Sequence, residues 1–156
     1  MATKTSAGIL MFHKSDGGIE VLLAHPGGPF FKNKDAGVWT IPKGVPEPNE
    51  NLMERARIEF EEEIGVKAEG ELFPLGTVTQ KSGKVVHAWA MEGDLPADFE
   101  ARSNTFELEW PPRSGKMQSF PEIDRAGFFS IEEAAHKINP AQKEFLDRLQ
   151  QYLGNQ

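Results

Sequence analysis

The chain has 156 residues, of which 38% are hydrophobic and 26% charged, and this composition predicts one globular domain over residues 1–156. It has no cysteine, which excludes disulfides, thiolate metal sites and a cysteine nucleophile. Its net charge of −7 disfavours non-specific nucleic-acid binding through a basic surface. No stretch has the apolar length of a signal peptide or a membrane span, so we expect a cytoplasmic protein with no membrane partner.

In chain order, the first expected elements are two strands, a loop and a third strand. Residues 8–12 and 19–25 are apolar and flank a Gly-rich turn, which predicts a hairpin. The segment 25–32 is too rich in proline and glycine for regular structure. Residues 38–41 then predict a short strand that Pro42 ends.

The strongest helix pattern follows, from residue 49 or 50 to residue 64. Asn49 is the expected N-cap, and Gly65 is the expected residue of positive φ that ends the helix. Apolar residues recur at spacings of three and four, which predicts one buried stripe made of Met53, Ala56, Phe60 and Ile64.

The second half of the chain predicts strands first and helices last. The expected strands cover residues 72–80, 84–91, 106–110 and 128–129, and the expected helices cover residues 131–138 and 141–153. Both faces of residues 84–91 are mostly apolar, which indicates an interior strand. Residues 106–110 alternate and should be half-buried, whereas residues 111–122 are expected to form a loop.

Three glutamates in the long helix share one side of it. Glu59, Glu62 and Glu63 stand at i, i+3 and i+4, a spacing that brings their carboxylates within reach of a common point. Like charges there disfavour the helix, but a hard divalent cation such as Mg²⁺ would reverse that cost. A solvated acidic face is the alternative, since Glu54 and Glu61 show that acids in this helix need not be ligands.

Residues 44–66 carry a longer pattern that resembles the Nudix box. That box is Gly, five residues, Glu, seven residues, and then Arg-Glu-apolar-any-Glu-Glu-any-Gly-apolar. Eight of its nine specified positions match, and these are Gly44, Glu50, Glu59, Phe60, Glu62, Glu63, Gly65 and Val66. The preceding Pro42-Lys43 is similar to the usual lead-in, and residues 128–134 resemble the late aromatic strand and helix of the family.

This resemblance implies an α/β/α sandwich around a mixed, curved sheet and a metal-dependent pyrophosphohydrolase. It assigns Mg²⁺ or Mn²⁺ to Glu59, Glu62 and Glu63, with help from the Gly44 carbonyl. Either Glu59 or Glu62 would also accept a proton from the attacking water. Glu122, six residues before Phe128, fits the loop glutamate that many members add, and an ordinary exposed loop acid is the alternative.

One box position departs from the family pattern, because Ile58 stands where the arginine belongs. Ile58 cannot donate a hydrogen bond or offset charge, so Glu50 and Glu62 lose the usual orienting partner. Arg55 lies one turn before Glu59 and is placed to compensate in part, whereas Arg57 is expected to face solvent. Two outcomes follow: retained hydrolysis, or a catalytically weak or inactive Nudix module that binds nucleotides as a sensor or interaction unit.

A nucleotide-like diphosphate is the expected small-molecule partner, and assembly as a homodimer is compatible with these expectations. Lys43 and Arg113 are candidate phosphate contacts, although a solvated loop arginine is the simpler interpretation of Arg113. His87 is a candidate for lining the cleft. Aromatic candidates for a wall against the leaving group are Phe30, Phe31, Trp39, Trp89 and Trp110, each of which could equally be core or loop packing.

The substrate markers of the family give little guidance here. Residues 81–84 hold neither the proline of ADP-ribose enzymes nor the tyrosine of dinucleoside polyphosphate enzymes. Residues 133–149 are weakly similar to the diadenosine-tetraphosphate hydrolase branch. The resulting order of expectation is a nucleoside polyphosphate, then a nucleoside triphosphate, then a nucleotide sugar.

Overall fold

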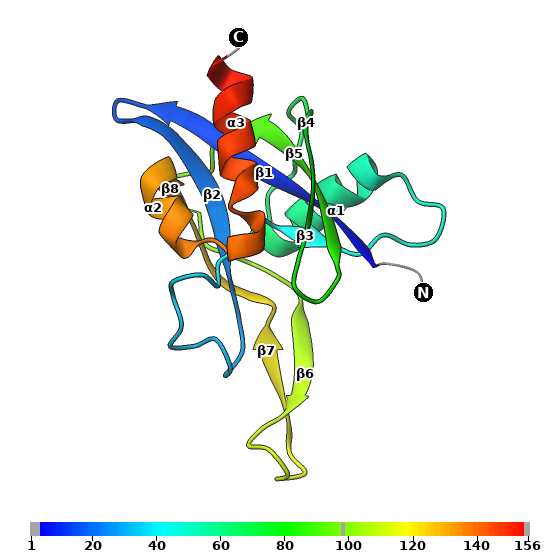
Figure 1. The fold of residues 1–156 in the computed structure, drawn as a ribbon. Helices are drawn as coiled ribbons and strands as arrows, with labels where there is room; N and C mark the ends of the chain where they lie inside the picture. The colour runs from blue at the N-terminus through cyan, green and yellow to red at the C-terminus, as the bar shows by residue number, and fades with distance from the viewer. Residues whose placement is uncertain (1–3, 98, 155–156) are drawn as a thin grey trace.

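A computed structural model describes residues 4–97 and 99–154, which form a mixed sheet with helices on both faces (Figure 1). Five strands lie in the order β4-β5-β1-β2-β8, and β3 pairs with β1. Their bounds are β1 (Thr5–Ser15), β2 (Gly18–Pro26), β3 (Lys43–Gly44), β4 (Phe73–Thr79), β5 (Val85–Glu92) and β8 (Ile123–Ser130). β1 and β5 run parallel, while the other pairs are antiparallel.

The two faces of the sheet bury separate hydrophobic clusters. Alternate residues of β1 point to opposite sides, so Ile9 joins a cluster with Phe60 of α1 (Leu52–Ile64). Leu10 joins the other cluster with Phe145, under α2 (Ile131–Lys137), the 3₁₀ turn Pro140–Gln142 and α3 (Glu144–Gly154). This arrangement confirms the expected α/β/α sandwich.

The N-terminal hairpin is confirmed as β1 and β2, but the short strand expected at residues 38–41 is not a paired strand. Only two isolated bridges occur there, from Thr40 to Ala24 and from Trp39 to Ile138. These bridges tie the segment to both β2 and the end of α2. The sequence pattern was apolar because the segment is buried between two elements, not because it belongs to the sheet.

The glutamate helix α1 begins later than expected. Asn49 has a φ of 67°, outside the helical region, and the N-cap is Asn51, whose side chain accepts a hydrogen bond from Glu54 N at 3.1 Å. Gly65, with a φ of 86°, ends the helix as expected. Met53 is 38% exposed because it lies in the first turn, whereas Ala56, Phe60 and Ile64 are fully buried.

The segment expected to be a loop at residues 111–122 contains a strand. β7 (Met117–Pro121) pairs antiparallel with β6 (Thr105–Glu109) in a separate two-stranded sheet. Figure 1 shows this hairpin extending away from the sandwich. β7 is mostly exposed, so it has too few apolar residues to predict a strand from sequence alone.

The remaining strands and helices follow the sequence expectations closely. β4 and β5 occupy the expected segments, and β5 is an interior strand between β4 and β1. β8 is longer than the two residues expected. Within the described ranges, no helix combines the length and the apolar character needed to span a bilayer.

Candidate metal and active site

The most buried acid of the glutamate helix is Glu63, whose exposed fraction is 7%. It faces Lys43 of β3, whose charge and backbone N–H favour the ionised carboxylate. Burial, followed by the charge of Glu59, raises the pKa of the Glu63 carboxyl to about 8. A cation bound beside Glu63 would therefore stabilise its ionised form.

Glu59 lies directly over Gly44. A Cβ built on Gly44 would collide with the Glu59 carboxyl group, so the site depends on a residue without a side chain at this point. β3 reaches this position because Gly8 of β1 is also bare; a Cβ there would lie 2.6 Å from the Pro42 carbonyl oxygen. Two glycines therefore let β3 fit between β1 and α1.

The charges of two further acids reach this pair. Burial is the main cause that raises the pKa of Glu59, and the charges of Glu62 and Glu122 add to it, while a hydrogen bond from Arg55 opposes the rise. Glu122 also acts on Glu63. Its backbone is fixed by bonds from Gly27 N to Glu122 O (2.8 Å) and from Glu122 N to Asn104 O (2.9 Å). Three glutamates of α1 and the distant Glu122 are thus close enough to affect one another's charge.

Arg55 holds the outer edge of this acidic group. Its Nε and Nη2 donate to the two carboxylate oxygens of Glu50 at 2.7 and 2.9 Å, and its Nη1 donates to Glu59 Oε1 at 3.0 Å. All three side chains are mostly buried, with exposed fractions of 14% for Arg55, 19% for Glu50 and 14% for Glu59. Arg55 therefore gives Glu50 the ion-pair partner that Ile58 cannot provide.

Ile58 itself makes no such contact and is 40% exposed. It lines a surface cavity of about 350 Å³ together with Glu62. The expectation that Arg57 faces solvent was wrong: its Nη1 donates to the carbonyl oxygens of Ala68 (2.7 Å) and Gly70 (2.8 Å). Arg57 therefore fastens the chain that follows α1, where carbonyl groups would otherwise lack donors.

The expected substrate contacts lie in different places. Lys43 is close to Glu63 and Glu59, and burial, followed by the charge of Lys84, lowers its pKa to about 8. His87 stacks on Trp89, with ring centroids 4.3 Å apart, and burial lowers the pKa of its imidazole. Of these two expected contacts, Lys43 is the one that lies close to the glutamates of α1.

Two other expected contacts lie elsewhere. Trp39 is 4% exposed and belongs to the hydrophobic cluster under α2 and α3, on the face of the sheet opposite α1. Its indole N–H donates to Asp35 at 2.7 Å. Arg113, with a φ of 62°, lies in the exposed turn between β6 and β7. The structure gives neither residue a contact with the glutamates.

The chemistry of these donors fits a hard divalent cation. Glu59, Glu62, Glu63 and Glu122 offer carboxylate oxygens, and Gly44, whose carbonyl is an expected ligand, contacts Glu59, so the set has the oxygen donors that Mg²⁺ and Mn²⁺ prefer. Burial first, and then the charges of neighbouring glutamates, raise the pKa values of Glu59 and Glu63, so a bound cation would stabilise their ionised forms. In the described part of the chain, no three acidic or histidine side chains already form a finished metal site.

A second feature near these acids had only a faint signal in the sequence. A cavity of about 560 Å³ lies between the loop after β2 and the β6–β7 hairpin, and Trp110 is in its wall. Of the aromatic residues singled out from sequence, Trp110 is the one that lines this cavity. The cavity itself could not be foreseen, because β7 was not recognised as a strand.

Comparison with known proteins places this geometry in context. The profile of the NUDIX domain matches residues 2–149. The Ap4A hydrolase of C. elegans, solved as a binary complex, aligns with a TM-score of 0.69 and 22% identity, over 97% of this chain and 99% of that one. The MutT protein of Methanosarcina mazei Go1 aligns with a TM-score of 0.61 and 18% identity, over 98% of each chain.

A third solved structure is the NUDIX domain of Shewanella oneidensis NrtR in complex with ADP ribose. It aligns with a TM-score of 0.68 and 14% identity, over 98% of this chain and 90% of that one. At these identities the structural likeness establishes the fold. The profile match over nearly the whole chain, together with the glutamate helix against β3, establishes more: this chain belongs to the Nudix family.

Proposed function

We propose that this chain hydrolyses the diphosphate linkage of a nucleoside diphosphate linked to another moiety, the general activity of the family. Mg²⁺ or Mn²⁺ would be held by Glu59, Glu62 and Glu63, with the Gly44 carbonyl and Glu122 completing the set. A nucleoside polyphosphate or triphosphate is the first choice of substrate. This order rests on the C-terminal similarity noted above, and the likeness in fold to an Ap4A hydrolase is in keeping with it.

The observation that carries this proposal is the position of Arg55. In a chain with Ile58 in the box, the glutamates would be free to turn away from one another. Arg55 instead donates hydrogen bonds to both carboxylate oxygens of Glu50 and to one oxygen of Glu59. All three side chains are mostly buried. Such charge-assisted, two-pronged contacts are strong and directional. They keep the acidic group in order, as catalysis requires.

The side chains have separate tasks in the proposed reaction. A bound divalent ion would neutralise phosphoryl oxygens and make a water molecule more acidic. Glu59 or Glu62 accepts the proton of the attacking water, because both lie on the same side of α1 as the metal ligands. Lys43, next to Glu63 and Glu59, is placed to contact a phosphate oxygen. The leaving phosphate is thereby held while water attacks.

A nucleotide panel tests this proposal. Diadenosine polyphosphates, nucleoside triphosphates, ADP-ribose and nucleotide sugars would be incubated with the chain and Mg²⁺, then with Mn²⁺, and the release of phosphate or nucleoside monophosphate followed. The proposal expects metal-dependent turnover of at least one class. Tight binding of a nucleotide with no product released over the whole panel would favour the alternative, a Nudix module that binds without cutting, for which Ile58 is the motive.

A further inference from the structure

The cavity beside the β6–β7 hairpin has the composition of a site for a flat aromatic group. Its volume of about 560 Å³ lies in the range of small-molecule sites. The aromatic rings of Trp110 and Phe120 and the ring of Pro29 line it, and Lys32, Gln118 and Asp124 add polar groups. Rings combined with a few polar groups are the usual device for binding a nucleobase.

The hairpin wall of the cavity is held in place by specific contacts. Phe30 packs edge-on against Trp110, with ring centroids 5.4 Å apart, and Gln118 Nε2 donates to the Trp110 carbonyl at 2.7 Å. Gly28, with a φ of 98°, lets the loop approach the hairpin, since a Cβ there would lie 2.9 Å from the Phe106 ring. These contacts order both walls before any ligand arrives.

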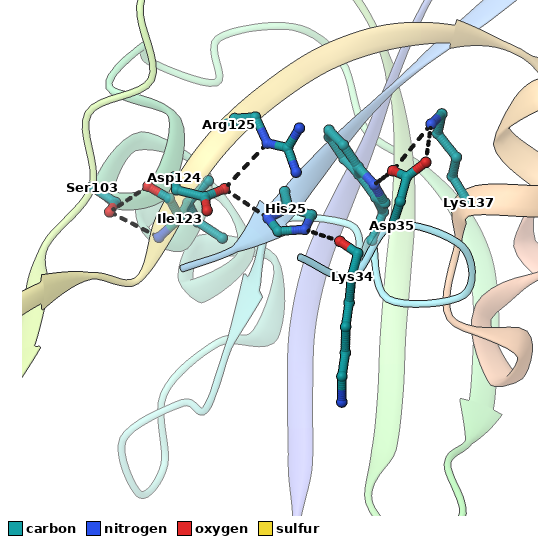
Figure 2. Close-up of polar contacts among 9 residues, drawn as sticks. His25, Lys34, Asp35, Ser103, Ile123, Asp124, Arg125 and Lys137 are labelled. Carbon is teal, nitrogen blue, oxygen red and sulfur yellow. Dashed lines mark hydrogen bonds and ion pairs between the residues drawn. The ribbon is translucent and has the colours of Figure 1, made fainter. Parts of the chain in front are cut away.

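Asp124, one of the residues that line the cavity, is held by a buried histidine. His25 is fully buried; its Nε2 donates to the carbonyl oxygen of Lys34 at 2.7 Å, and its Nδ1 lies 2.7 Å from Asp124 Oδ1 (Figure 2). The ring thus joins the loop after β2 to the start of β8. Asp124 is 29% exposed and lines the cavity, so its carboxylate can also serve a ligand.

Glu122 connects the cavity with the acidic group. Pro121 and Asp124 line the cavity, and Glu122 and Ile123 lie between them in the chain. The charge of Glu122 reaches Glu59 and Glu63. A ligand in the cavity would therefore extend towards the glutamates, with Lys32 on the loop side to meet a phosphate or ribose oxygen.

Two side chains of the cavity offer hydrogen-bond acceptors to a ligand. Gln118 uses one of its two amide N–H groups on Trp110, and its oxygen can accept, while the carboxylate of Asp124 only accepts when ionised. We propose that this cavity binds the base of the substrate between the hairpin and the loop, and that it prefers a base bearing an exocyclic amine. This inference rests on the proposed function, since it places the base of the same substrate.

Binding without metal or turnover tests the inference separately from hydrolysis. Trp39 and Trp89 are 4% and 6% exposed, so quenching of tryptophan fluorescence by an added nucleotide would report on Trp110. GMP, IMP and ribose 5-phosphate serve as probes, and Trp110→Phe confirms the source of the signal. We expect GMP to quench and to bind about 10-fold more tightly than IMP, which has the same ring system without the amine. Ribose 5-phosphate, which lacks a base, should not quench.

Matched variants on one strand complete the test. Phe120→Ala should weaken GMP binding by about 5- to 150-fold, the range for loss of one stacking partner. Met117→Ala, on the same strand, 60% exposed and outside the cavity lining, should bind GMP as the wild type does. Because GMP binding is measured without metal or turnover, a failure of hydrolysis leaves this result intact. Equal binding of ribose 5-phosphate and GMP, of IMP and GMP, or of the Phe120→Ala and wild-type chains would overturn the inference.

Discussion

Arg55 donates hydrogen bonds to both carboxylate oxygens of Glu50, through Nε at 2.7 Å and Nη2 at 2.9 Å. It stands three residues before Ile58, the position at which the Nudix box has its arginine. Positions 55 and 58 lie one turn apart on the same side of α1. Arg55 therefore gives Glu50 an ion-pair partner from one helical turn before Ile58, and it adds a bond to Glu59.

Removing Arg55 should therefore damage catalysis more than stability. Arg55→Ala leaves Glu50 and Glu59 without their shared partner, and we expect kcat/KM to fall by about 10- to 100-fold, the usual effect of losing a group that orients metal ligands. Steady-state kinetics over a range of Mg²⁺ concentrations measures this loss. The apparent affinity for Mg²⁺ should weaken in the same variant.

A second substitution provides the decisive control for Arg55. The double variant Arg55→Ala with Ile58→Arg puts the guanidinium group back at the box position, so it should recover most of the lost activity. Ile58→Arg alone should change kcat/KM by less than about threefold, because Arg55 already holds the glutamates. Absence of any recovery in the double variant would show that Arg55 acts in another way.

Glu63 should make the stability of the metal-free protein depend on pH. The pKa of this carboxyl is about 8 in the folded chain against an ordinary value of 4.5, so folding favours its protonated form. Its stabilising contribution is fully present below pH 4.5 and is lost as the pH rises through about 8. Glu63→Gln copies the uncharged, protonated form with a side chain of the same length. We expect its metal-free Tm near pH 8 to exceed that of the wild type by about 2–4 °C.

Mg²⁺ provides the complementary result for Glu63. Because the ion binds the ionised carboxylate, it should raise the Tm of the wild type more at pH 8 than at pH 6. The Glu63→Gln variant should show little of this rise. Thermal unfolding gives the Tm of each protein at pH 6 and at pH 8, with and without Mg²⁺. An unchanged response to Mg²⁺ in the variant would remove Glu63 from the ligand set.

Much of the fold was predictable because its signals are local. The hydrophobic period of α1 and the glycine that ends it predict the helix, and the mostly apolar faces of β5 predict an interior strand. The hairpin strand β7 was missed because Met117, Gln118 and Ser119 are exposed and carry no apolar period. Its pairing with β6 depends on the partner strand, which a scan along the chain does not see.

The glutamates of the box were predictable in kind, but their surroundings were not. Fixed spacing identified Glu59, Glu62 and Glu63, and proximity in the helix suggested Arg55 as a partner. The contact between Glu59 and Gly44 and the anchoring of Arg57 on Ala68 and Gly70 depend on the approach of other segments. Such contacts join residues more than ten positions apart, and no local pattern encodes them.

Gly44 should tolerate no side chain. A Cβ at this position would meet the Glu59 carboxyl group, so Gly44→Ala should displace Glu59 and lower kcat by about 100-fold, the effect of a displacement near 1 Å in a catalytic site. Gly17→Ala is the matched control, since a Cβ there meets nothing within 4 Å. The control should keep wild-type kinetics. Wild-type turnover by Gly44→Ala would mean that Glu59 is not needed where the structure places it.

His25 should stabilise the loop that follows β2. His25→Leu keeps a similar volume but leaves Asp124 and the Lys34 carbonyl without their partner, and we expect a loss of about 1–3 kcal/mol in the free energy of unfolding. Chemical denaturation measures the loss. Hydrogen exchange should show faster opening of the amide of Lys34, which donates to Phe31 O at 2.9 Å, than of amides in β5. Unchanged exchange in the loop would contradict this role.

The central claim is that Glu59, Glu62 and Glu63 act together on a diphosphate, and one comparison tests it most directly. Single substitutions of each to glutamine would be assayed beside Glu54→Gln, an exposed acid in the first turn of the same helix. At saturating Mg²⁺, with the best substrate of the panel, the three box variants should each lose at least about 100-fold in kcat, while Glu54→Gln keeps wild-type turnover. Equal turnover in all four variants would contradict the account.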